Sequence, residues 1–93
     1  MPDLTDLDFR RRRLSFRAWH RGTREADLMI GGFAEKYAAG WGLAEIDWFE
    51  ALLDSQDVDI MAWAIGKAQP PEYLQGEQMA ALQRLDYVAK AMR

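Results

Sequence analysis

The chain contains no cysteine among its 93 residues. This absence excludes disulfide bonds, thiolate catalysis and cysteine-based metal sites, and it suits a reducing compartment. The only histidine is His20, so a cluster of imidazole ligands for a metal is excluded as well. No apolar run approaches the roughly 20 residues that a membrane-spanning helix needs. We therefore expect neither a metal centre nor a membrane partner.

Strand signals are also scarce in this sequence. Apolar and polar residues do not alternate, β-branched residues are few and hairpin turn motifs are missing. With 49% hydrophobic and 29% charged residues, the composition suits a soluble globular protein rather than a disordered chain. A chain of this length has room for one core. We predict a single all-α domain over residues 1–93.

Apolar residues recur at helical spacing and predict a compact five-helix bundle. A flexible tail is expected over residues 1–7, with Asp6 or Asp8 as a helix cap. Asp57 is interpreted as the N-cap of the fourth helix, and Pro70 and Pro71 separate it from the fifth, because proline cannot continue a helix. The expected helices cover about residues 8–21, 23–39, 44–53, 57–65 and 76–92.

Charge is unevenly distributed along the chain, whose net charge is −3. Residues 10–24 contain seven arginines and no acid, whereas residues 25–59 contain nine acids and one lysine. Two surfaces of opposite potential would favour an oriented encounter with a macromolecular partner. We therefore expect the arginine-rich segment to attract an acidic surface.

The sign of the charge changes within the segment HRGTREAD, residues 20–27. A structural interpretation makes Gly22 the N-cap of the second helix, with Glu25 at position N3 reaching back to the cap amide. Alternatively, Thr23 is the cap and Glu25 occupies N2. This helix corner explains the glycine and the acids, but not the flanking arginines.

Two further interpretations use the same segment. In a catalytic one, His20 and Glu25 act as base and orienting residue, but no nucleophile or phosphate-binding loop accompanies them. We therefore expect no enzyme activity. In a nucleic-acid one, the basic helix Arg10–Arg24 binds phosphates while Phe16 and Trp19 stack on bases. An isoelectric point near 5.0 disfavours this alternative, although it stays open at this stage.

A protein-docking interpretation accounts for more of these residues. Arginine and tryptophan frequently anchor protein interfaces, and a glycine corner lets a partner approach the backbone. We expect Arg21 and Glu25 to project outward together and to form charge-assisted hydrogen bonds with a partner. The predicted contact residues are Arg17, Trp19, Arg21, Gly22, Arg24 and Glu25.

Two sequence blocks resemble those of a known family. The first combines R-G-x-x-E with E-x-D-L-x-x-x-x-F, formed here by Arg21, Gly22, Glu25, Asp27, Leu28 and Phe33. The second, FEALLDSQDVDIMAWAIG, contains Leu52, Leu53, Asp57, Asp59, Ile60, Trp63 and Gly66. With the block order and the expected helices, they resemble the SdhE family of flavinylation factors over roughly residues 12–67. Thr23 and Ala26 depart from the commonest family pattern, where larger apolar residues are frequent.

The resemblance implies a chaperone-like function. Family members bind the flavoprotein subunit of succinate dehydrogenase, in some bacteria also that of fumarate reductase, and promote covalent attachment of FAD to a histidine of that subunit. The resemblance places Arg21, Gly22 and Glu25 at the contact. It also implies no cofactor of the chain's own, and we expect no tight binding of free FAD because no dinucleotide fingerprint is present.

The sequence also leads to expectations about the cellular location and the oligomeric state of the protein. The opening MPDLTDLD lacks the basic and apolar segments of a secretory signal and is too acidic for a mitochondrial presequence, so we expect a bacterial cytoplasmic protein. We expect a monomer, while the four tryptophans leave self-association open.

Overall fold

The computed structural model describes the backbone of residues 2–88 and the side chains of residues 6–88. Within this part of the chain there is no strand, and the all-α, five-helix prediction is confirmed. The α-helices are α1 (Pro2–Trp19), α2 (Arg24–Tyr37), α3 (Leu43–Leu53), α4 (Asp57–Ala64) and α5 (Glu77–Arg84). Two 3₁₀ turns, η1 (Ala38–Gly40) and η2 (Glu72–Leu74), lie in the connections.

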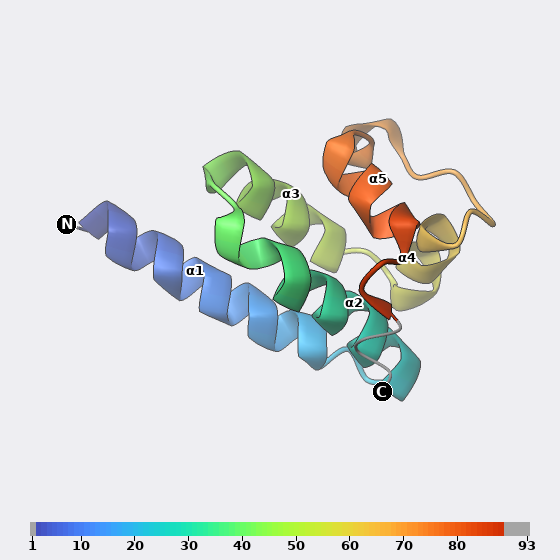
Figure 1. Cartoon of the computed structure of the whole chain (residues 1–93), viewed down its shortest axis with the longest axis horizontal. Coiled ribbons are helices and arrows are strands. Elements are labelled where there is room, and N and C mark those ends of the chain that lie inside the picture. Colours follow the sequence, from blue (N-terminus) through green and yellow to red (C-terminus); the bar gives the residue numbers. More distant parts are fainter. Residues whose placement is uncertain (1, 89–93) are drawn as a thin grey trace.

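The helices form two groups (Figure 1). The long helix α1 packs against α2 and α3, whereas α4 packs against α5. Within the first group the chain reverses at the connection between α1 and α2 and again at the connection between α2 and α3. The candidate site lies at the former.

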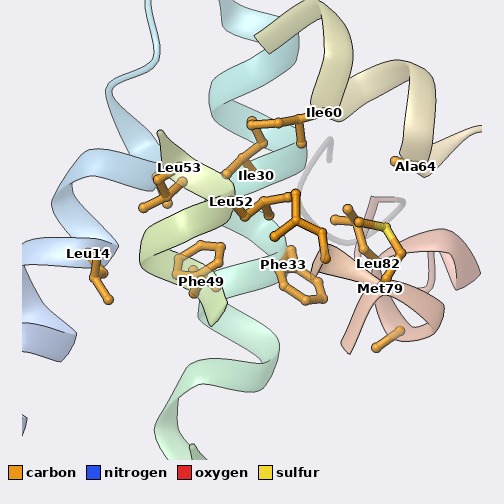
Figure 2. Packing of buried hydrophobic residues seen from close by; sticks show 14 of the residues in the cluster. Leu14, Ile30, Phe33, Phe49, Leu52, Leu53, Ile60, Ala64, Met79 and Leu82 are labelled. Carbon is orange, nitrogen blue, oxygen red and sulfur yellow. The ribbon is translucent and has the colours of Figure 1, made fainter. Parts of the chain in front are cut away.

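The core is centred on the buried ring of Phe33 in α2. Figure 2 shows this ring beside Leu52 of α3 and close to Met79 and Leu82 of α5. Edge-to-face and tilted ring contacts of this kind add to the stabilisation from burial. Five aromatic rings lie with their centroids 5.2–6.1 Å from that of Phe33: Tyr37, Trp41, Trp48, Phe49 and Tyr87.

A glycine permits the close contact between α1 and α2. The indole ring of Trp19 lies directly against Gly31, and a Cβ atom at that position would overlap the ring. Trp19 is consequently half-buried between the two helices. The last turn of α1 is thus held in a defined position just before the candidate site begins.

The predicted start of the first helix is wrong. Helix α1 begins at Pro2, so residues 2–7 are helical where the sequence predicted a flexible tail. Asp6 and Asp8 therefore lie inside the helix and do not cap it. Proline is well tolerated at the first helical position, where its missing amide hydrogen would have no helical partner.

The predicted end of the fifth helix is also wrong. Helix α5 ends at Arg84, because Leu85 adopts a left-handed conformation with φ 57° and ψ 25°. The chain then turns so that Tyr87 is buried, with its hydroxyl donating a 2.6 Å hydrogen bond to the carbonyl oxygen of Leu82. The remaining predicted helical residues, 89–92, lie outside the described part.

Candidate partner-binding site

The elbow, residues 20–25, joins α1 to α2 and depends on a glycine. Gly22 has φ +118°, a conformation that residues with a side chain rarely adopt. A Cβ atom placed at Gly22 would meet nothing within 4 Å. The glycine is therefore required by the backbone conformation and not by lack of space, and the surface beside it is open.

Two side chains of α2 fix the backbone of the elbow. Thr23 is the N-cap of α2, and its hydroxyl oxygen accepts a 3.2 Å hydrogen bond from the amide of Ala26. The carboxylate of Asp27 accepts hydrogen bonds from the amides of Arg21 and Gly22, at 2.5 and 3.3 Å. The interpretation of Gly22 as the N-cap with a reaching Glu25 is therefore wrong. The alternative cap at Thr23 is confirmed.

Arg21 points into the protein. Its side chain is only 11% exposed, and its Nε donates a 2.6 Å hydrogen bond to the carboxylate of Asp57. Its Nη1 and Nη2 donate to the carbonyl oxygens of Leu53 and Ser55, at 2.8 and 2.9 Å. The prediction that Arg21 and Glu25 project outward together is therefore wrong. The planar guanidinium fits the carboxylate and the free carbonyls where α3 ends, so it lies there instead.

The outward charges of the elbow are Arg24 and Glu25. Both are exposed, and neither forms an ion pair with any side chain among residues 6–88. His20 is exposed too, and its ring stacks on that of Phe16 with the centroids 4.0 Å apart. Its Nδ1 lies 2.7 Å from the carbonyl oxygen of Phe16. The elbow thus presents a cation, an anion and an aromatic pair to solvent.

Arginines of α1 and of the elbow meet acids of α3, of the connection that follows it and of the start of α4 within the same chain. This ion-pair row follows the helical repeat on both sides, because α1 and α3 lie side by side and run in the same direction. Its pairs are Arg10–Asp47 (2.7 Å), Arg13–Glu50 (3.7 Å), Arg17–Asp54 (3.0 Å) and Arg21–Asp57 (2.6 Å). The expectation that the opposite charges form two surfaces for a partner is therefore wrong for these four arginines and four acids. They neutralise each other.

This pairing also bears on the nucleic-acid alternative. Four of the seven cations that a basic helix would offer to phosphates, Arg10, Arg13, Arg17 and Arg21, are engaged by carboxylates of the ion-pair row. Arg11 is engaged as well, by Asp8 at 3.0 Å and by the carbonyl oxygen of Trp41 at 2.6 Å. Arg12 and Arg24 are exposed and form no ion pair among the described residues, so only these two arginines of the segment are unengaged.

Asp57 has a role that sequence reasoning missed. The N-cap of α4 is Gln56, and Asp57 is the first helical residue, so its interpretation as the cap is wrong. Its carboxylate faces Arg21 instead of its own helix amides. The signal was present in the sequence, since arginines 10, 13, 17 and 21 have nearly the same spacing as acids 47, 50, 54 and 57. Counting the charges of each segment does not reveal this match in spacing.

The six predicted contact residues therefore lie in different settings. Gly22, Arg24 and Glu25 are exposed on the elbow. Arg17 is paired with Asp54, Trp19 is half-buried and Arg21 is largely enclosed. An open depression beside the elbow is lined by Trp19, His20, Gly22, Thr23, Arg24, Asp27 and Leu28.

Other kinds of site find no support in the described part of the chain. Among the described residues, no three histidine or acidic side chains are grouped so that they could hold a metal ion. None of the helices described is long and apolar enough to cross a membrane.

Comparisons with known proteins agree with the sequence blocks. A family model named Sdh5, described as flavinator of succinate dehydrogenase, matches residues 12–86. The chain is 43% identical over 67 residues to the FAD assembly factor SdhE of Acetobacter pasteurianus, which covers 72% of this chain and 62% of that protein. It is 40% identical over 58 residues to the mitochondrial succinate dehydrogenase assembly factor 2 of Debaryomyces hansenii, covering 62% and 41%. The chain thus spans less than two thirds of the length of these relatives.

Proposed function

The chain belongs to the Sdh5 family of flavinators of succinate dehydrogenase, and we propose that it is an assembly factor that binds the flavoprotein subunit of this enzyme and promotes covalent attachment of FAD. The observation that carries the proposal is the family match over residues 12–86, which includes the whole elbow and the acids that face α1. The bacterial relative, named as an FAD assembly factor, supports it.

The elbow is the part of the surface best suited to this docking. Gly22 leaves open space next to the backbone, so a partner's main chain can approach closely. Arg24 and Glu25 are free to form charge-assisted hydrogen bonds of opposite polarity, which fixes the orientation of a partner. Arg21, in this proposal, contributes by shaping the elbow rather than by reaching out.

The factor itself would supply no reacting atom. The covalent bond would form between a histidine of the partner and its bound FAD, so the chain carries no FAD and is not an enzyme. Its contribution would be to hold the partner in the arrangement in which the two groups meet, because orientation alone can lower a barrier substantially. The proposal places the factor in the bacterial cytoplasm as a monomer, with the fumarate reductase flavoprotein as a second client.

Replacing Glu25 tests the proposal. Glu25→Ala should keep the wild-type helix content, because an exposed acid in the first turn contributes about 1 kcal/mol or less to stability. It should nevertheless capture less flavoprotein subunit in a tagged pull-down and lower the in-gel flavin fluorescence of that subunit. Because Glu25 is exposed, its replacement is expected to weaken docking while the fold stays intact.

Glu35→Ala is the matched control. Glu35 is an exposed acid on the same helix, without a hydrogen bond or ion pair to the side chains described, and its replacement should leave capture and flavin fluorescence unchanged. The proposal fails if a strain lacking the factor keeps full covalent flavin, or if the wild-type chain captures no flavoprotein.

A further inference from the structure

We propose that Asp57 is a positioning residue for partner docking: with the carbonyl oxygens of Leu53 and Ser55 it forms a receptor for Arg21 and thereby holds the elbow in its outward shape. The effect on partner binding rests on the proposed function, since Asp57 would shape the docking surface without touching the partner. The effect of Asp57 on the shape of the elbow can be tested on the free protein alone.

The receptor holds Arg21 at every guanidinium nitrogen. Nε, Nη1 and Nη2 each donate a hydrogen bond of 2.6–2.9 Å, to Asp57, Leu53 and Ser55 respectively. The two carbonyl oxygens belong to the end of α3 and the loop after it, while Asp57 opens α4. A planar group with donors in a fixed fork loses most of its freedom in such a site. Arg21 is therefore fixed relative to both α3 and α4.

The same residue is anchored a second time through its backbone. The amides of Arg21 and Gly22 both donate to the carboxylate of Asp27 in α2. Arg21, near the start of the elbow, thus has its side chain held by the α3–α4 junction and its backbone held by α2. Next follows Gly22 with φ +118°, where an added Cβ atom would meet nothing within 4 Å. Together with the Thr23 cap, these two anchors set the direction of positions 22–25.

The Arg21–Asp57 pair differs from the rest of the ion-pair row. Its side chains are 11% and 26% exposed, whereas Asp47, at the other end of the row, is 60% exposed. Solvent-exposed ion pairs contribute little because water and salt screen them. An enclosed guanidinium that loses its carboxylate keeps its charge but lacks a charged partner. Only this pair adjoins the elbow.

Removing the carboxylate should therefore loosen the elbow while leaving its exposed groups in place. In Asp57→Ala the guanidinium retains two carbonyl acceptors but loses its only charged one, so we expect it to turn towards water. Asp57→Asn keeps an oxygen that can accept from Nε and should give an intermediate result. If Asp57→Ala does not fold, Asp57→Asn carries the same comparison.

The first measurement is made on the free full-length chain. Amide NMR shifts and hydrogen exchange of residues 21–26 are compared among wild type, Asp57→Ala, Asp57→Asn and Asp47→Ala. The expected result is shifted, faster-exchanging elbow amides in Asp57→Ala, a smaller change in Asp57→Asn and none in Asp47→Ala. Unchanged shifts and exchange rates in Asp57→Ala would overturn the inference.

The second measurement is a binding cycle with purified flavoprotein subunit. Wild type, Glu25→Ala, Asp57→Ala and the double variant are titrated, and Asp47→Ala serves as the ion-pair control. If Asp57 acts through the elbow, its loss should weaken binding about tenfold and should cost much less once Glu25 is already replaced. A merely structural role would give losses that multiply independently, and that result would refute the positioning role.

The two proposals fail in distinguishable ways. A wild-type chain that does not bind the subunit contradicts the proposed function, while the NMR comparison still decides whether Asp57 holds the elbow. A wild-type chain that binds, with Glu25→Ala weakened and Asp57→Ala unaffected, contradicts the positioning role alone.

Discussion

At the scale of single residues, Arg21 shows why composition is a poor guide to a docking surface. Sequence reasoning recognised a charged corner with a necessary glycine, and it named the three exposed residues Gly22, Arg24 and Glu25. It misplaced Arg21, because a sequence shows that a residue is charged but not which group it will meet. Three acceptors from a segment more than thirty residues away decide its direction.

Gly22 provides the residue-scale prediction. Gly22→Ala should lower the free energy of unfolding by about 1–3 kcal/mol, because alanine must adopt an unfavourable backbone conformation there. The measurement is urea unfolding followed by far-ultraviolet circular dichroism.

Gly40→Ala is the control for Gly22→Ala. A Cβ atom at Gly40 also meets nothing within 4 Å, but the backbone there does not have the positive φ of Gly22. This replacement should change stability by no more than about 1 kcal/mol in either direction. Equal stability of the two variants would contradict the strained elbow.

At the scale of elements, the apolar spacing located α2, α3 and α4 well, because each carries a buried stripe that ends at a glycine or an acidic turn. It failed at the two outer ends. The start of α1 has no distinctive cap in the sequence, and the end of α5 is decided by tertiary contacts. There, Asp86 accepts hydrogen bonds from the hydroxyl of Tyr37, at 2.7 and 2.9 Å, and Tyr87 is buried against Phe33.

The turn after α5 has a predictable pH dependence. Burial, followed by the nearby charge of Asp86, raises the pKa of Tyr87 above its usual value. The folded state therefore holds this proton more tightly than the unfolded state. Its contribution to stability is complete below the ordinary tyrosine pKa of about 10 and is lost as the pH rises further. The free energy of unfolding should fall by up to about 1.4 kcal/mol per pH unit from this residue.

Urea unfolding at pH 9, 10 and 11 measures this effect. Tyr87→Phe should be less stable at neutral pH, since its hydrogen bond to Leu82 is lost, but its stability should fall less steeply at high pH. Tyr73 is exposed, so Tyr73→Phe should keep the wild-type slope. Identical slopes in the two variants would show that Tyr87 is not the group responsible.

At the scale of the whole molecule, family resemblance and structure meet at the elbow. The sequence blocks identified the family correctly, and the five-helix architecture agrees with the one they implied. The uneven charge distribution was recognised but was interpreted as a surface for a partner. The ion-pair row instead joins α1 to α3 and the start of α4. A pattern of opposite charges at matching helical spacings predicts an internal contact at least as well as an external one.

The proposed function depends on the elbow being the surface that meets the flavoprotein. Hydrogen–deuterium exchange of the full chain, with and without purified flavoprotein subunit, tests this directly. Bound protein should show slowed exchange concentrated at residues 20–25, with residues 65–76 between α4 and α5 unchanged. Slowed exchange confined to residues 65–76, or none anywhere, would contradict the account.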